Sequence, residues 1–441
     1  MRAWWVLLFA MGCYRPAPAP GAPCSPSGEC PSGQTCQAGV CVLAGDAGGD
    51  ACPATACVGE QITDCTGTHA CAFGCAAGGP PHCLALVPSN GITVDLLDGA
   101  TADVAAPELL FDTETGEIED ENGDLLRPPG EGVIGGIGFT IRDGMGVFTA
   151  HSFTLEAAAQ WEADGQNALV LFAADAIEIA GLLDVGGNGS FAGPGGGDGS
   201  DGGPASTGCT GGDGRFKMTI SASAGGGGGG GATAGGGGAA TMADPNGATA
   251  GGAGGTACSP PSATPLVGGN GGGAAGAENG VVRGGPGGGA GGAVALVAMT
   301  RVRVSGAVAA PGNGGGTNAT ANGGGGGGSG GAVFLESPVV ELVGALTANG
   351  GGGGPPGNTN VLRVFGGRGH IADATPASGG TFNNVAGGTG GAGTTAPTNG
   401  GTLLGGAGGG GAAGAIHIRS RSAQITGLTS PTAASDQATL E

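Results

Sequence analysis

Residues 168–185 read ALVLFAADAIEIAGLLDV, and this stretch decides the fold because the chain repeats it. Three later stretches follow the same plan: AVALVAMTRVRVSGAVAA at 293–310, AVFLESPVVELVGALTA at 332–348 and AIHIRSRSAQITGLTS at 415–430. The copies align on a shared glycine, which is Gly181, Gly306, Gly344 and Gly427 in turn. A recurring unit with its own apolar face is the signature of a solenoid, in which each copy buries that face on its neighbours.

Within each copy, apolar and polar residues alternate with the period of two that is typical of a strand. We therefore predict an all-β fold, a right-handed parallel β-helix over residues 137–429 with long glycine-rich loops. The shared glycines are expected at bends or close backbone contacts. The second copy shows the expected faces: Val302, Val304 and Val308 inward, and Arg301, Arg303 and Ser305 outward. His417 is expected to point outward for the same reason.

Glycine accounts for 110 of the 441 residues, and two arrangements of the glycine runs stay open. A run such as 225–231 has no side chain to offset the entropy of ordering it. The runs are therefore either loops between coils or polyglycine helices that pack backbone to backbone. The hydrophobic fraction of 39% argues against a disordered chain, and the lack of a Gly-X-Y register excludes collagen.

The charge balance excludes two classes of partner. The net charge is −21, from 34 acidic and 13 basic residues, so the chain has no basic footprint for nucleic acid or for an anionic membrane surface.

Two candidate motifs carry no functional signal. The GxSxG match at 327–331 lies inside a glycine run, and Lys217 does not follow glycine as a P-loop lysine would. We predict no cofactor, no metal ligand and no catalytic residue.

The N-terminus reads MRAWWVLLFAMGC, which resembles a bacterial lipoprotein signal. That resemblance implies cleavage after residue 12, with 1–12 as signal peptide, and lipidation of Cys13. An ordinary signal peptide or a misassigned start is the alternative. Residues 13–23 are proline-rich and are expected to form a stiff tether.

Cysteines support an oxidising compartment, because twelve remain once Cys13 is set aside. Ten fall in a Cys-rich module, residues 24–86, whose first part resembles a small EGF-like disulfide knot. Zinc bound at Cys71-x3-Cys75 with nearby histidines is the alternative to disulfides there. Cys209 and Cys258 are expected to pair with each other, because no other cysteine follows Cys83.

Residues 87–136 are acidic and are expected to link the module to the β-helix and to cap one end of it. The stretch FDTETGEIEDENGD, residues 111–124, allows a calcium site. The competing interpretation is a β-hairpin that turns near Thr115 and Gly116 with solvated charges outside. Residues 430–441 are expected to form a polar tail.

Two stretches carry a family resemblance: GQNALVLFAADAIEIAGLLDVGGNG at 165–189 and GGAVFLESPVVELVGALTANGGGG at 330–353. With the order of signal, cysteine module, acidic segment and glycine-rich repeats, they resemble the glycine-rich, PGRS-like surface lipoproteins of myxobacteria. The resemblance implies an exported protein, lipid-anchored at the outer membrane or cell surface, in a family without an assigned activity.

We accordingly expect a non-enzymatic envelope protein with a structural or adhesin-like role. Its expected partners are the membrane, through the lipid, and extracellular polysaccharide or envelope proteins. The alternative is a polysaccharide-active β-helix enzyme, a lyase or hydrolase, but the outward faces lack clustered aspartates. They carry instead Arg301, Arg303, Glu178, Glu336, Glu341, Arg419 and Arg421.

Overall fold

The computed structural model describes the chain from residue 24 onward, with gaps. The described residues are 24–25, 27, 29–30, 34–37, 40–43, 55–64, 66–200, 208–218, 222–243, 246–259, 265–276, 284–317, 323–357 and 364–441. The predicted signal peptide, Cys13 and the proline-rich tether lie outside them. The chain divides into two compact units, Met1–Cys83 and Leu84–Glu441.

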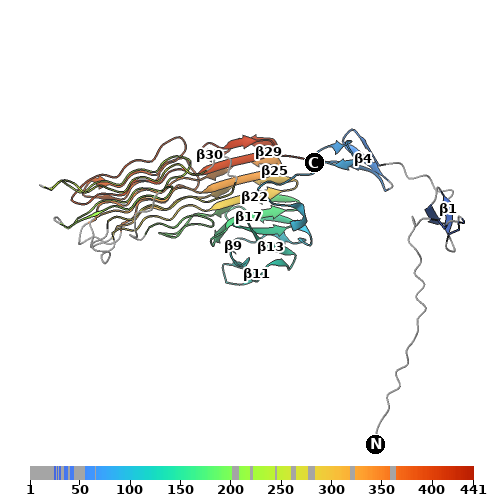
Figure 1. Cartoon of the computed structure of the whole chain (residues 1–441), viewed down its shortest axis with the longest axis horizontal. Coiled ribbons are helices and arrows are strands. Elements are labelled where there is room, and N and C mark those ends of the chain that lie inside the picture. The colour runs from blue at the N-terminus through green and yellow to red at the C-terminus, as the bar shows by residue number, and fades with distance from the viewer. Residues whose placement is uncertain are drawn as a thin grey trace, which may run out of the picture. The chain divides into compact units, whose positions relative to one another are not determined.

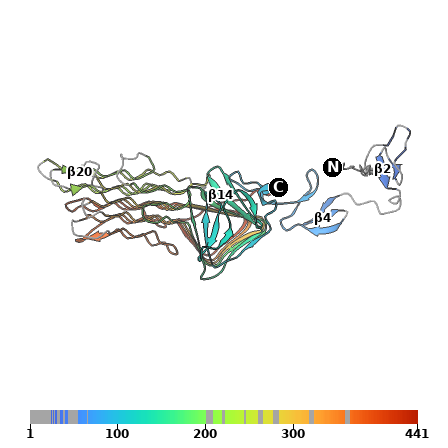
Figure 2. The ribbon, with the colours of Figure 1, turned by 90° about the horizontal axis from the view of Figure 1, so that it is seen from below.

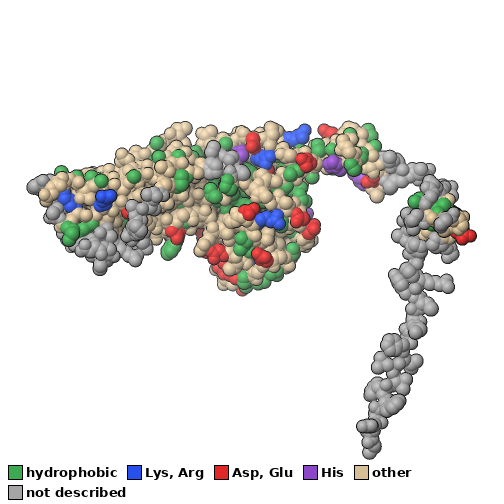
Figure 3. Space-filling view, in the orientation of Figure 1, with side chains coloured by type: hydrophobic (Ala, Val, Ile, Leu, Met, Phe, Trp, Pro, Cys, Tyr) green, Lys and Arg blue, Asp and Glu red, His purple; other side chains and the backbone are tan. Residues whose placement is uncertain are grey.

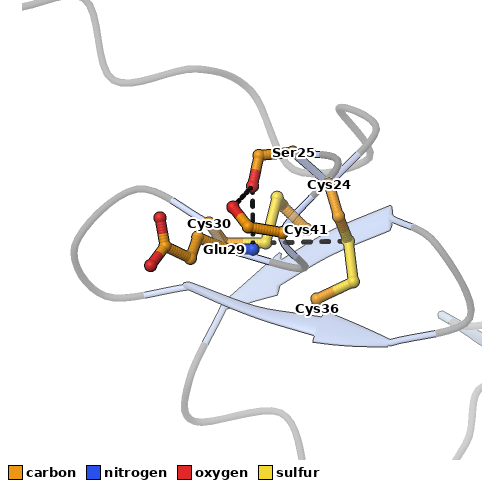
Figure 4. Close-up of a disulfide and its surroundings, with 7 residues drawn as sticks. Cys24, Ser25, Glu29, Cys30, Cys36 and Cys41 are labelled. Carbon is orange, nitrogen blue, oxygen red and sulfur yellow. Dashed lines mark hydrogen bonds between the residues drawn. A yellow bond between two sulfur atoms is a disulfide. The ribbon is translucent and has the colours of Figure 1, made fainter.

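The first unit consists of short antiparallel hairpins held by disulfides. Its strands are β1 (Gln34–Gln37) with β2 (Val40–Leu43), β3 (Ala56–Val58) with β4 (Gln61–Asp64) and β5 (Gly67–Ala70), and β6 (Cys75–Ala76) with β7 (His82–Cys83). Among the described residues, disulfides join Cys24 to Cys36, Cys30 to Cys41, Cys57 to Cys75 and Cys71 to Cys83. Figure 4 shows the first two close together beside the 24–30 segment. Disulfides therefore supply the cross-links that so small an apolar core cannot.

The second unit is built from three parallel ladders, and each sequence repeat contributes one strand to each ladder. The first ladder contains β14 (Met145–Ala150), β17 (Ala168–Ala173), β22 (Ala293–Ala298) and the first halves of β25 (Ala332–Leu342) and β29 (Ala415–Ile425). The second contains β15 (Ser152–Leu155), β18 (Ala176–Ile179), β23 (Arg301–Val304) and the second halves of β25 and β29. The third contains β16 (Gln160–Asp164), β19 (Leu182–Asp184), β24 (Ala307–Ala309), β26 (Ala345–Thr347) and β30 (Leu428–Ser430).

The all-β prediction is confirmed, with 37% of residues in strands and 1% in helix. Because β25 and β29 run unbroken from the first ladder into the second, those two ladders form one curled sheet. Figures 1 and 2 show the strands stacked side by side, bent around a common interior.

The alternation predicted from the repeats holds in the structure. Val302, Val304 and Val308 are fully buried in one core, whereas Arg303 is exposed. The shared glycines stack at the corner between the second and third ladders. A Cβ on Gly306 would lie 2.0 Å from the carbonyl oxygen of Gly181, so this corner admits no side chain.

The acidic segment 87–136 does more than link and cap, because it shares the core of the repeats. Its strand β8 (Asp103–Val104) pairs in parallel with β15, and β9 (Glu108–Asp112) pairs in parallel with β16. Antiparallel strands then close this end of the ladders: β10 (Ile118–Asp120), β11 (Leu125–Arg127), β12 (Gly132–Ile134) and β13 (Ile137–Arg142). Arg127 is fully buried there, and its guanidinium donates to backbone carbonyl oxygens, including those of Gly116 at 2.5 Å and Gly130 at 2.6 Å.

Residues 430–441, predicted as a polar tail, pair in part with the rest of the unit. Strand β31 (Ala434–Asp436) pairs in parallel with β29, and Leu440 forms a bridge with Leu86. These segments, with the 3₁₀ helix η1 (Val94–Leu97), border a second apolar cluster on the outer face of the first ladder. His417 projects from that face, as expected, but it is 5% exposed, and its ring packs at a tilt of 48° against Phe334 with 5.4 Å between ring centroids.

The glycine-rich segments form an arm that extends from one corner of the ladders (Figure 1). They leave after β19, β24 and β26 and return at β22, β25 and β29, so every insertion joins the third ladder to the first. They span residues 185–292, 310–331 and 348–414. Of the two arrangements left open by the sequence, the described residues adopt the second: extended chains packed backbone to backbone.

The run 225–231 shows how these chains pack. Its amide groups donate in a cycle of three: Gly225 and Gly228 to one neighbouring segment, at Ala239 and Gly236, with N···O distances of 2.9 and 2.8 Å. Two further neighbours accept from the positions between: Gly324 and Gly327 from Gly226 and Gly229, and Gly212 and Cys209 from Gly227 and Gly230. A three-residue screw directs successive groups to three sides, which is the geometry of a polyglycine II helix, the glycine counterpart of polyproline II. The run is fully buried although it has no side chains.

Candidate functional site

The outward charges of the second ladder are paired with each other. Arg301 forms an ion pair with Glu178 on strand β18, and Nε of Arg303 lies 3.6 Å from Oε2 of Glu341 on strand β25. Because positive and negative groups alternate along this face, they neutralise one another. The face is therefore a set of partly exposed ion pairs and not a groove of converging carboxylates, which a polysaccharide lyase would need.

Glu336 and Arg419 lie on the first ladder, under the outer layer. Oε2 of the fully buried Glu336 accepts from the amide and the hydroxyl of Ser89, at 2.8 Å each, and Oε1 accepts from Arg419 at 3.2 Å. Burial raises the pKa of Glu336 despite these bonds. The carboxylate thus ties the segment around Ser89 to the ladder, where substrate has no access.

An acidic cleft lies across strands β9, β10 and β16, with a cavity volume of about 440 Å³. Its charged lining consists of Glu108, Glu119, Asp120, Glu121 and Glu162. Figure 3 shows acidic side chains gathered over this part of the strand region, whereas the arm shows few charged groups on the same face.

The predicted hairpin is present at this end: β9 and β10 are antiparallel, and the Gly116 amide donates to the Asp112 carbonyl at 2.9 Å. The carboxylates that suggested calcium serve the turns. Asp112 accepts from the amides of Glu114 and Thr115, and Asp120 accepts from those of Asn122 and Asp124, which lowers the pKa of Asp120.

Across the described ranges, three metal-ligating side chains come within reach of one ion at one place, Cys24, Cys30 and Cys41, whose sulfurs are in disulfides. The zinc alternative at Cys71 and Cys75 also fails, because both thiols are in disulfides. In the arm, Cys209 and Cys258 are joined to each other. Ser329, the serine of the GxSxG match, is fully buried, and its hydroxyl accepts from the amide of Asn270 at 2.8 Å.

A second polar cleft, of about 290 Å³, lies where the arm leaves the third ladder; we call it the arm-base cleft. It is lined by Glu162, Ala163, Asp184, Gly186, Gly187, Asn188, Asn313 and Arg368. Asp184 is 6% exposed, and its Oδ1 accepts from the Gly186 amide at 2.8 Å and from Nη2 of Arg368 at 2.7 Å. Asn313 is also 6% exposed, and its Nδ2 has no hydrogen-bond partner among the described residues.

The sequence alone did not point to Asp184, Asn313 or Arg368 as site residues. Asp184 ends a strand, whereas Asn313 and Arg368 stand in the glycine runs PGNGGG and GGRGH. One signal in the sequence could have found Asn313 and Arg368: each is a single long or polar residue inside a run made almost entirely of glycine. Distance along the chain hid the rest, because 184 residues separate Asp184 from Arg368.

Among the described residues, no helix is long and apolar enough to cross a membrane. No known protein family, no curated protein and no solved structure matches this chain. Its function is therefore inferred from the arrangement of its own residues.

Proposed function

We propose that this chain is a non-enzymatic surface lipoprotein, in which a right-handed parallel β-helix carries a rigid polyglycine arm for structural or adhesive contact outside the cell. The observation that supports the proposal is the arm itself. Its chains are joined by backbone hydrogen bonds in three directions, so it is an ordered rod with few side chains for chemistry.

The ladder geometry supports the β-helix part of the proposal. Each repeat supplies one strand to each of three parallel ladders, and the chain then returns to the first ladder one position further along. Parallel crossover connections are right-handed in about 98% of cases because strands twist to the right. A crystal structure with left-handed coils, or with coils that fail to close, would reject this part.

The lipoprotein part of the proposal places the molecule at the outer membrane or cell surface, with Cys13 as the lipid attachment site. Wild-type cells fed labelled palmitate should label the protein, and the Cys13→Ser variant should remain unlabelled. Protease treatment of intact cells should release peptides from residues 137–429. Equal labelling of both proteins would contradict the anchor.

The contact role predicts a change in adhesion or envelope texture in a deletion strain. Restoring the full chain should restore the phenotype, and restoring a chain that lacks residues 185–292 should not. A deletion strain that adheres like wild type would contradict the role.

The enzymatic alternative keeps one specific observation, the acidic cleft. Asp164 lies on the same strand as Glu162 of the cleft, and desolvation first, then neighbouring carboxylates such as Asp112, raise its pKa. Glycoside hydrolases combine one carboxyl group of raised pKa with a second that stays ionised. Polysaccharide cleavage by the purified protein that Glu162→Gln abolishes would establish this alternative.

A further inference from the structure

We propose that the arm-base cleft binds a neutral sugar residue of an extracellular polysaccharide. The inference rests on the proposed contact function and names its ligand class. The cleft holds donors and acceptors together, and one of its donors is buried without a hydrogen-bond partner among the described residues.

This donor is Nδ2 of Asn313, on a residue that is only 6% exposed. Buried polar atoms in folded proteins are nearly always hydrogen-bonded, and leaving one unpaired is unfavourable. Because Asn313 lines the cleft, an oxygen atom of a bound ligand can accept from it there.

The acceptor and the cation of the cleft are already partly engaged with each other. Oδ1 of Asp184 takes both the Gly186 amide and Nη2 of Arg368, which leaves Oδ2 and the remaining guanidinium N–H groups for a ligand. Vicinal hydroxyls of a sugar both donate and accept, so they match a carboxylate, a guanidinium and an amide placed together.

Charge selects against other small ligands. An anion would meet Asp184 and Glu162, and a metal cation would meet Arg368, so a neutral polyol fits the mixture best. A volume of about 290 Å³ lies just below the roughly 300–1,000 Å³ typical of small-molecule sites, which suits one ring and not a long oligosaccharide.

The arrangement of Asp184 and Arg368 requires a residue without a side chain at Gly186. A Cβ at that position would lie 2.2 Å from Nη2 of Arg368 and 2.7 Å from Cγ of Pro311. The glycine therefore admits the guanidinium into the cleft, where the arm begins at the end of β19.

The test is affinity electrophoresis of the full, disulfide-bonded chain through gels that contain dextran, galactan or mannan. Polygalacturonate serves as the anionic probe, and calorimetry with calcium chloride tests the cation. The variants are Arg368→Met and the near-isosteric Asn313→Asp, with Arg421→Met, an exposed arginine of β29, as the matched control. Thermal melts identify variants that remain folded.

We expect at least one neutral polymer to retard the wild-type protein and the Arg421 control. Arg368→Met and Asn313→Asp should bind that polymer about tenfold or more weakly, because a site built to hydrogen-bond a hydroxyl loses its partner. If Asn313→Asp does not fold, Arg368→Met decides the question.

Three results would overturn the inference: neutral polymers bind folded Arg368→Met as tightly as wild type, polygalacturonate or calcium binds alone, or no polymer binds. Adhesion distinguishes this failure from failure of the proposed function. Cells that need the protein for adhesion but adhere normally with Arg368→Met would keep the contact role and reject the sugar site.

Discussion

Replacing Gly228 by alanine tests whether the arm is held together by backbone packing. A Cβ at Gly228 would lie 2.0 Å from the carbonyl oxygen of Gly410, whereas real Cβ atoms stay at least 3.0 Å from such neighbours. The two chains would therefore have to separate by about 1 Å.

The oxygen of Gly410 also accepts from the Gly236 amide at 2.8 Å, and the oxygen of Gly236 accepts from Gly228 at 2.8 Å. A shift of this size weakens both buried hydrogen bonds, and each unsatisfied buried group costs about 1–3 kcal/mol. We expect the substitution to lower the free energy of unfolding of the arm by about 3 kcal/mol.

Gly237→Ala is the matched control in the same arm. The nearest atom to its added Cβ is Oδ1 of Asn399 at 3.4 Å, an ordinary contact, and the backbone there is not left-handed. Alanine at such a position stabilises by about 0.4–1 kcal/mol, because it reduces the entropy of the unfolded chain.

Calorimetry and hydrogen exchange of the peptide 225–231 measure the difference. Gly228→Ala should lower Tm by about 5 °C or more and speed exchange across the run, while Gly237→Ala should leave both unchanged or improved. If the two variants behave alike, the arm is not packed backbone to backbone and the reasoning fails.

Three further predictions concern the strand region. Val304→Asp places a carboxylate in the core and should lower Tm strongly, whereas Arg303→Gln, one residue away on the exposed face, should change stability by less than about 1 kcal/mol; equal losses would refute the assigned faces. The raised pKa of Glu336 means that the folded protein favours the protonated carboxyl group. Its contribution to the free energy of unfolding is therefore fully present below the ordinary glutamate pKa and is lost as pH rises through the pKa of the folded state. Glu336→Gln should therefore gain stability relative to wild type as pH rises from about 4 to about 8, and a difference independent of pH would contradict this. The hydrogen bond to Asp103 raises the pKa of His151 above 6.5, so NMR titration should show it falling in Asp103→Asn, and an unchanged value would exclude that cause.

What the sequence alone can predict depends on how far apart along the chain the interacting residues lie. The period of two determined the strands and their faces, because a side chain on a strand alternates sides whatever its partner is. The role of the glycine shared by the repeats could be predicted for a similar reason. Each copy bends at the same place, where its glycine meets the glycine of the copy before it. The hairpin around Thr115 and Gly116 is likewise set by residues a few positions apart.

The tertiary structure decided what depends on neighbours far along the chain. A glycine in 225–231 is identical in sequence to its neighbours, yet Gly226 faces Gly324 and Gly227 faces Gly212, so no local pattern could choose between loops and a packed arm. His417 is buried by a chain end that looked merely polar. The arm-base cleft joins Asp184, Asn313 and Arg368 from three separate segments, because every insertion leaves the ladders at the same corner.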